Sequence, residues 1–226
     1  MNNNTNVSES VLGWFYLFFH VMLLPYLARW INSQLPIPIG SAWLTLFSYG
    51  FSFVMLLMIC HSFLASAATH STKNSPQWLR AVSLGFCIYY TSTALMDIIM
   101  PAWFSEYKQV YNATLVTMME LDFIPMSIGV IFLVPFVEEI LYRGILFRTL
   151  YNWNKTMGYV ASIIIYAGFH IMAYAGGNDP STLLMCFLQF LPAGFTLAWT
   201  YVNSDNIFAP ITIHVIMNAM GVFAMR

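Results

Sequence analysis

The chain has 226 residues, of which 59% are hydrophobic and only 8% are charged, and its formal net charge is −1. A soluble domain is typically about 45–50% apolar and about 25% charged, whereas the mean hydropathy here is +0.69. The composition therefore argues against a soluble domain and predicts an integral membrane protein. The nearly neutral charge also provides no basic surface for nucleic acid.

The N-terminal residues MNNNTNVSES are polar and contain neither Lys nor Arg. A secretory signal peptide begins with a positively charged region, so residues 1–10 are interpreted instead as a disordered polar tail. No linker, charge run or internal repeat divides the remaining sequence. Residues 11–226 are therefore predicted to form a single integral-membrane domain.

A helix needs about 20 mostly apolar residues to cross a bilayer, and about seven segments of this sequence meet that requirement. They are 11–31, 43–67, 81–101, 123–150, 157–175, 181–202 and 207–225. Segment 123–150 is too long for one straight span, and Pro135 is expected to bend it because proline has no N–H. The fold class predicted is all-α: a polytopic transmembrane helical bundle of about seven spans, or eight if the semi-polar segment 105–121 crosses rather than lies at the interface.

The orientation follows from the loops that carry Lys and Arg, which stay on the cytoplasmic side. Lys73 and Arg80 lie between the second and third segments, and Arg148 and Lys155 lie between the fourth and fifth. In a seven-span arrangement these two loops face the same side of the membrane. The N-terminus is therefore predicted to be cytoplasmic.

Polar side chains occur in pairs within three of the predicted spans. The pairs are Glu139 with Arg143, Tyr166 with His170, and His214 with Asn218, and Glu138 precedes the first pair. The members of each pair are four residues apart and so lie on one face of a helix. Because such a face is costly in lipid, the three helices are predicted to turn these faces toward one shared polar cavity.

Single polar residues in the other spans are weaker signals. His20, His61 and Asp97 each occur alone, and each is interpreted as a polar contact between helices. The paired residues exceed what helix packing requires, since packing alone would use Ser, Thr or Gly.

The paired residues are the groups needed for hydrolysis of an acyl bond by water. A carboxylate can act as a general base, an imidazole can orient the water, and a second imidazole and an amide can donate to a developing oxyanion. A zinc site formed by His170, His214 and Glu138 is the alternative, because two histidines and a glutamate are a common catalytic zinc set. The sequence contains neither H-E-x-x-H nor the G-x-S-x-G of a serine nucleophile.

Three short motifs in this region resemble those of a known family. EEILYR at 138–143, YAGFH at 166–170 and HVIMN at 214–218 are similar, in the same order, to the E-E-x-x-x-R, F-x-x-x-H and H-x-x-x-N motifs of the CPBP intramembrane proteases. This family is also called Abi or CAAX-protease-like, and it includes the type II CAAX prenyl endopeptidases. The resemblance covers about residues 123–222, the expected catalytic core, and residues 11–122 are expected to be variable N-terminal spans. Tyr166 stands where the family usually has Phe.

The resemblance implies a glutamate-type endopeptidase that needs no metal and no other cofactor. It implies that Glu138 activates the water with help from His170, and that His214 and Asn218 stabilise the oxyanion. Glu139, Arg143 and Tyr166 are implied to be supporting residues.

The partners implied by the resemblance are a peptide or lipidated-protein substrate and the membrane lipids. The implied reaction is CAAX-like cleavage, or processing or self-immunity related to a peptide pheromone or bacteriocin. The short chain favours a location in a bacterial plasma membrane. The alternative is a non-catalytic membrane immunity or scaffold protein that binds a peptide or partner in the same polar cavity.

Overall fold

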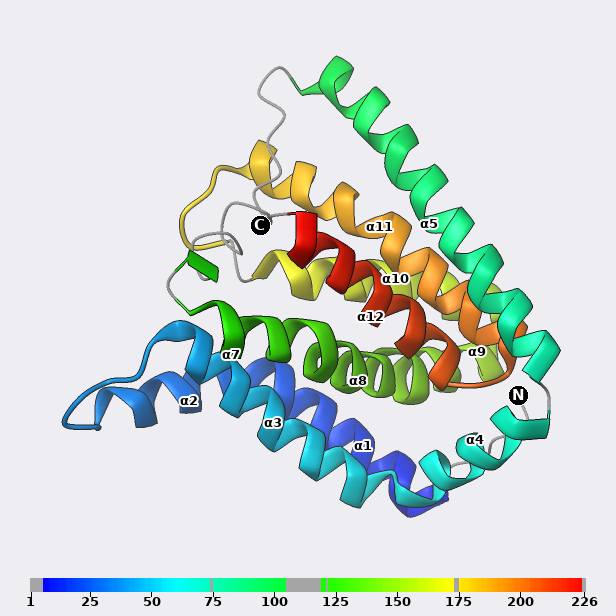
Figure 1. Cartoon of the computed structure of the whole chain (residues 1–226), viewed down its shortest axis with the longest axis horizontal. Coiled ribbons are helices and arrows are strands. Elements are labelled where there is room, and N and C mark those ends of the chain that lie inside the picture. Colours follow the sequence, from blue (N-terminus) through cyan, green and yellow to red (C-terminus); the bar gives the residue numbers. More distant parts are fainter. Residues whose placement is uncertain (1–5, 74, 105–118, 121, 173–174, 225–226) are drawn as a thin grey trace.

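The computed structural model describes residues 6–73, 75–104, 119–120, 122–172 and 175–224 (Figure 1). Across these ranges the chain is helical and contains no β-strand. The α-helices are α1 (Val7–Phe18), α2 (Leu24–Ser33), α3 (Ser41–Ile59), α4 (His61–Lys73), α5 (Ser75–Trp103), α7 (Phe123–Ile128), α8 (Val134–Glu139), α9 (Arg148–Trp153), α10 (Lys155–Met172), α11 (Pro180–Ser204) and α12 (Phe208–Ala224). Three π-helical segments join some of them: η1 (Phe19–Leu23), η2 (Gly129–Leu133) and η3 (Ile140–Phe147).

The predicted all-α membrane bundle is confirmed. Five helical stretches in the described ranges are long and apolar enough to cross a membrane: Val7–Ser33, Ser41–Ile59, Pro76–Trp103, Phe123–Trp153 and Pro180–Ser204. Helices α10 and α12 occupy the other two predicted segments, and α12 is a shorter apolar helix. The span count is thus roughly that predicted. Segment 105–121 lies almost entirely outside the described residues, so its placement stays a prediction.

The chain is already helical within the predicted disordered tail, which is a correction to that prediction. Helix α1 begins at Val7, and Glu9 in its first turn is only 4% exposed. The Glu9 carboxylate accepts a hydrogen bond from the Asn6 N–H at 3.1 Å and another from the Ser62 N–H at 2.8 Å. A carboxylate in this position satisfies otherwise unpaired N–H groups at a helix start, so a polar composition here indicates a capped helix rather than disorder over Val7–Ser10.

The second predicted span, 43–67, is divided into two helices. Helix α3 ends at Ile59, Cys60 leaves the helical conformation with φ −105° and ψ 25°, and α4 begins at His61. The carboxylate of Glu9 accepts hydrogen bonds from the backbone N–H groups of Ser62 and Phe63 at the start of α4. The apolar run alone predicts one continuous helix, because the side chain that caps the second helix lies more than fifty residues earlier in the sequence.

Two of the π-helical segments end two residues before a proline. Segment η1 precedes Pro25 and η2 precedes Pro135, and in each the closing N–H donates to the carbonyl five residues earlier. A proline ring displaces the carbonyl of the preceding turn and provides no N–H, and a widened π-turn accommodates both effects. Pro135 therefore widens the helix without breaking it, since the helix continues from Phe123 to Trp153.

The stretch Phe123–Trp153 is the central element of the bundle. It is the most buried of the five long helices, because 61% of its apolar 18-residue stretch lies inside the protein. Helices α1 and α3 pack against one side of it, and α12 and α10 pack against the other, while α11 and α5 extend the bundle beyond α12 (Figure 1). Charged residues on this central helix are consequently enclosed by protein rather than exposed to lipid.

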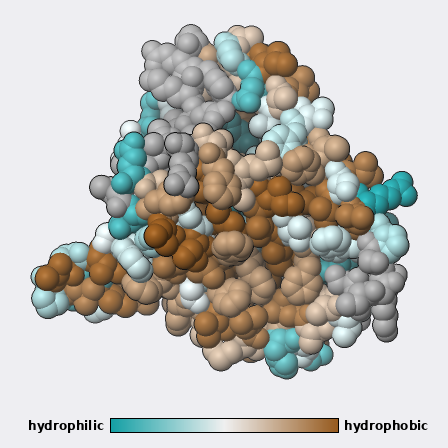
Figure 2. Space-filling model, in the orientation of Figure 1, coloured by the Kyte–Doolittle hydropathy of each residue, from teal (hydrophilic) through white to brown (hydrophobic). Residues whose placement is uncertain are grey.

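The outer surface is apolar, as expected for a protein surrounded by lipid. In Figure 2 hydrophobic side chains cover most of the middle of the visible face, and most hydrophilic ones lie toward its periphery. Large apolar side chains stand exposed along the outer helices, including Phe15, Phe18, Phe47, Ile98 and Phe223. Such a surface would associate in water, so it supports an integral membrane location.

Candidate active site

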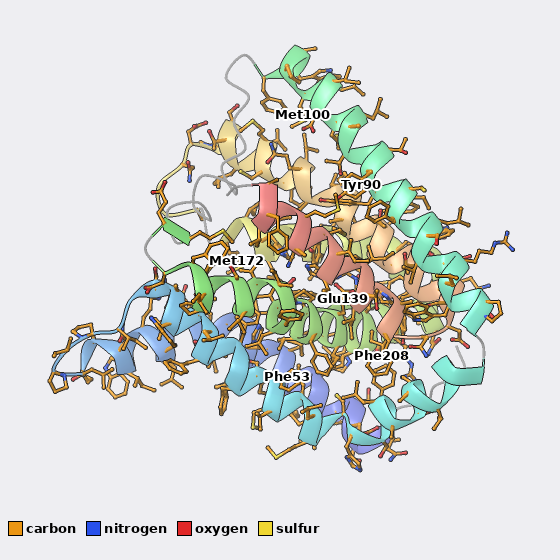
Figure 3. The ribbon with its side chains drawn as sticks, in the orientation of Figure 1. Phe53, Tyr90, Met100, Glu139, Met172 and Phe208 are labelled. Carbon is orange, nitrogen blue, oxygen red and sulfur yellow. The ribbon has the colours of Figure 1, made fainter. Side chains whose placement is uncertain are left out.

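The three predicted polar pairs lie on α8–η3, α10 and α12, and the structure brings these helices together. Glu139 connects the central helix to His214 on α12, and its neighbour Glu138 faces His170 on α10. Figure 3 shows Glu139 near the middle of the bundle, between α8 and α12. The i,i+4 spacing thus correctly predicted that these three faces converge.

Glu139 is completely buried and holds two partners with one oxygen. Its Oε1 atom accepts from Nη1 of Arg143 at 3.0 Å and from Nδ1 of His214 at 2.8 Å. Glu139 and Arg143 are both 0% exposed, and Arg143 also donates from Nη2 to the Gly194 carbonyl at 3.3 Å. This arrangement joins the central helix to α12, which carries His214 and Asn218, and to α11.

Arg143 has an aromatic contact as well as its hydrogen bonds. Its guanidinium carbon lies 4.3 Å from the centre of the Tyr166 ring, a distance at which the ring face attracts a cation. Tyr166 in turn stands 4.2 Å, between ring centres, from His170. The ring of Tyr166 therefore contacts both the buried guanidinium of Arg143 and the imidazole of His170, which lies one turn further along α10.

Glu138 is held more loosely than Glu139. Its Oε1 atom accepts a hydrogen bond from the Tyr49 hydroxyl at 3.2 Å, and its Oε2 atom lies 3.5 Å from Nε2 of His170. Within the described part of the chain Oε2 has no other hydrogen-bond partner. One oxygen of this carboxylate is therefore anchored, while the other faces an imidazole at a distance longer than most hydrogen bonds.

The proton arrangement of His170 follows from its second contact. Its Nδ1 atom lies 2.8 Å from the Tyr166 carbonyl, and since a carbonyl only accepts, Nδ1 carries a proton. In the neutral ring Nε2 is then an acceptor that faces the carboxylate oxygen of Glu138, which is also an acceptor. Two acceptors that face each other need a donor between them, either a proton on Nε2 or a water that donates one O–H to each atom.

His214 and Asn218 lie one turn apart on α12, beside the central helix. Nδ1 of His214 donates to Glu139, which leaves Nε2 for another partner. The amide nitrogen of Asn218 donates to the Val130 carbonyl in η2 at 2.7 Å. Because this nitrogen carries two N–H groups, the second stays available for an acceptor. Asn218 can therefore act as a hydrogen-bond donor, and Nε2 of His214 can do so when the ring is protonated.

Sequence analysis missed a group of residues on the N-terminal helices. Tyr49 on α3 contacts Glu138, and His20 on η1 makes a 2.9 Å hydrogen bond with Ser52 on α3. His20, which alone predicted only a contact between helices, thus lies beside the site. One signal was present: Tyr49 and Ser52 are three residues apart and so share a face of α3. By contrast, the side chain of His61 is 74% exposed and stands at the start of α4.

The geometry of the zinc alternative can also be compared with the site. Among the described residues there is no group of three His, Cys, Asp or Glu side chains arranged to hold a metal ion. The sequence alternative of a zinc site formed by His170, His214 and Glu138 therefore receives no support from the side-chain geometry.

A comparison with known protein families matches the part of the chain that contains this site. The sequence model of the type II CAAX prenyl endopeptidase Rce1-like family matches residues 120–220. The matched region contains all three motifs and confirms the resemblance to CAAX-type endopeptidases over that segment. Searches of curated proteins and of solved structures gave no match.

Proposed function

We propose that the chain is a multi-pass membrane endopeptidase that hydrolyses a peptide bond with a water activated by Glu138 and His170. The observation that carries this proposal is the pair formed by Glu138 Oε2 and His170 Nε2, 3.5 Å apart. A water that donates one O–H to each of these two acceptors would join them. The match of residues 120–220 to a family of endopeptidases supports the same chemistry.

The proposed reaction uses each side chain in one step. As the water oxygen bonds to the carbonyl carbon, its O–H bond breaks and the proton passes to Glu138, while His170 orients the water. His214, as an imidazolium paired with Glu139, and Asn218 donate hydrogen bonds to the oxyanion that forms. When the C–N bond breaks, the proton on Glu138 passes to the leaving amine, and the carboxylate is restored.

Glu139 and Arg143 support this chemistry without contacting the substrate in the proposed reaction. The ion pair between them lies at 0% exposure on both side chains, and it holds Nδ1 of His214. The pair therefore fixes which nitrogen of His214 is directed toward the substrate. Tyr166 has the analogous role on α10, because its backbone carbonyl holds Nδ1 of His170.

The proposed substrate is a peptide or lipidated protein that reaches the site near the membrane. The family match favours CAAX-like cleavage, and processing or self-immunity related to a pheromone or bacteriocin is the bacterial counterpart. We further propose that the N-terminus is cytoplasmic. The start of α1, the α4–α5 junction and the α9–α10 junction lie at the same end of the bundle in Figure 1, and the last two carry Lys73, Arg80, Arg148 and Lys155.

The test is a cleavage assay on the purified full-length protein in detergent, using a lipidated peptide with a CAAX-type C-terminus and an unmodified peptide. We expect Glu138→Ala and His170→Ala each to lose roughly 10²–10⁴-fold in kcat. Two matched controls, Glu120→Ala and His61→Ala, remove the same side chains from exposed positions. Circular dichroism and thermal unfolding would establish that all four variants are folded.

Two results would overturn the proposal. If Glu138→Ala and His170→Ala both cleave at the wild-type rate, the catalytic assignment is wrong. Peptide binding without cleavage in every variant, wild type included, would favour the scaffold or immunity alternative. A further arm tests the zinc alternative: we expect cleavage to continue after thorough treatment with a chelator, and activity restored only by added Zn²⁺ would instead support a metal mechanism.

A further inference from the structure

The side of Glu138 that faces the N-terminal helices contains a second set of polar contacts. The Tyr49 hydroxyl donates to Glu138 Oε1 at 3.2 Å, across 89 residues of sequence. The ring of Tyr49 lies 5.3 Å from that of His20, edge to face at 76°. His20 in turn makes the 2.9 Å hydrogen bond between its Nδ1 and the Ser52 hydroxyl. These three residues therefore form a connected group that ends on the carboxylate.

Most of the group is enclosed within the protein: Tyr49 is half-buried, and the other two side chains are buried. Ser52 is 0% exposed and His20 is 9% exposed. Phe53, one turn after Tyr49, packs on Phe136 of α8 with ring centres 4.5 Å apart, and Figure 3 shows it on α3 beside the central helix. The face of α3 that carries Tyr49 is thus pressed against the helix that carries Glu138.

Packing alone does not account for these side chains. Helices meet closely in membranes through small residues, and a buried imidazole or hydroxyl adds a desolvation cost unless it is hydrogen-bonded. Here His20 is hydrogen-bonded to Ser52, and the Tyr49 hydroxyl is hydrogen-bonded to one oxygen of Glu138. His20 also lies in the π-helical segment η1, and π-segments inside α-helices occur frequently at functional sites.

We propose that Tyr49 is a positioning residue for Glu138, and that His20 and Ser52 hold Tyr49 in place. The hydroxyl of Tyr49 anchors Oε1 and so stops the carboxylate from rotating, which keeps Oε2 directed at His170. This inference rests on the proposed function of Glu138. It also assigns a role to the N-terminal helices, because all three residues lie outside the matched segment 120–220.

The decisive variant is Tyr49→Phe, which removes the hydroxyl and keeps the ring. A hydrogen bond to a charged group typically contributes enough for a change of about 10- to 100-fold in rate when it acts at the transition state. We expect kcat to fall by that factor while KM stays unchanged, because Tyr49 does not contact the substrate. The matched control is Tyr90→Phe on α5, whose hydroxyl donates to the sulfur of Met220 rather than to a carboxylate, and this variant should behave as wild type.

A second variant keeps the test independent of any folding defect in Tyr49→Phe. Ser52→Ala removes the partner of His20, and we expect a smaller fall in kcat of roughly 3- to 10-fold with KM unchanged. Ser52→Thr, which restores a hydroxyl, should recover most of the lost activity. A purely structural role would instead lower the melting temperature in step with activity and would leave kcat per folded molecule unchanged.

The outcomes separate this inference from the proposed function. If Glu138→Ala cleaves as well as wild type, the proposed function itself fails. If Glu138→Ala is inactive but Tyr49→Phe and Ser52→Ala both match Tyr90→Phe, only the positioning role is overturned. A rise in KM at constant kcat in Tyr49→Phe would also overturn it, because Tyr49 would then contact the substrate directly.

Discussion

Two adjacent carboxylates of the central helix, Glu138 and Glu139, have opposite surroundings. Glu139 accepts from Arg143 and His214 at 3.0 and 2.8 Å, and it is completely buried. Glu138 accepts one hydrogen bond from Tyr49, and its other oxygen faces His170 at 3.5 Å. Neighbouring positions on a helix point about 100° apart, which directs one carboxylate toward α12 and the other toward α10.

This difference separates stability from chemistry within one motif. The Glu139 carboxylate is paired with a buried guanidinium, and removing it leaves a buried charge without compensation. Among the described residues each carboxylate keeps one oxygen without a hydrogen-bond partner, but only that of Glu138 faces an imidazole, at 3.5 Å, and this is the arrangement proposed to take a proton from water. The motif EEILYR thus contains a structural glutamate and a proposed catalytic one, and the predictions below test whether the two roles are in fact separate.

The largest expected effect is on stability, in Glu139→Ala. Loss of this carboxylate leaves Arg143 buried without its partner, and breaking a buried ion pair typically costs about 3–5 kcal/mol. We expect thermal or denaturant unfolding in detergent to show that loss for Glu139→Ala, and a much smaller one for Glu138→Ala. A double variant, Glu139→Ala with Arg143→Met, should recover part of the stability because no buried charge remains. Equal destabilisation by the two single Glu variants would contradict the division of roles.

The sequence was sufficient to predict one half of this site and not the other. Residues 138–143, 166–170 and 214–218 each carry their polar residues four apart, and this local spacing predicted the Glu139–Arg143 pair and the convergence of three helices. Tyr49 and His20 were not predicted, because a Tyr in an apolar helix is unremarkable and its contact with Glu138 spans 89 residues. Glu9 was missed for a similar reason, since two of the three N–H groups that it binds belong to α4. Interactions within one helix are visible in a sequence, whereas contacts between distant helices depend on how the helices pack.

The next effect is on catalysis, in Asn218→Ala. Asn218 donates one N–H to the Val130 carbonyl, and the second is proposed to stabilise the oxyanion beside His214. Removing one oxyanion donor costs about 10²–10³-fold in kcat, so we expect that loss in the peptide cleavage assay. Asn203→Ala is a matched control, because the Asn203 amide likewise donates to a backbone carbonyl, that of Trp199, but lies exposed at the end of α11.

Stability of the two Asn variants sharpens the comparison. If Asn218→Ala loses activity while its unfolding matches that of Asn203→Ala, Asn218 has a role in the reaction, as is proposed for Glu138. If instead the variant unfolds as readily as Glu139→Ala and retains kcat per folded molecule, Asn218 has a structural role, as Glu139 does. The hydrogen bond to Val130 would then be its main contribution.

The smallest effect is expected at Asp179, an exposed carboxylate that serves as a reference for the two buried ones. Asp179 precedes α11, and it accepts hydrogen bonds from the Thr182 hydroxyl and from the backbone N–H groups of Thr182 and Ser181. The bonds to Thr182 are the main reason that the pKa of Asp179 is lowered from its ordinary value. A lowered folded-state pKa means that this stabilisation is complete above the ordinary aspartate pKa of about 3.9 and is lost as the pH falls through the lower folded value. We therefore expect Asp179→Ala to melt slightly below wild type at neutral pH, and the gap to close on acidification below about pH 4. If the difference in melting temperature widened with acid, the neutral form of Asp179 would be the stabilised one, as in a carboxyl group without N–H donors. Asp179 could then not serve as the exposed reference for Glu138 and Glu139.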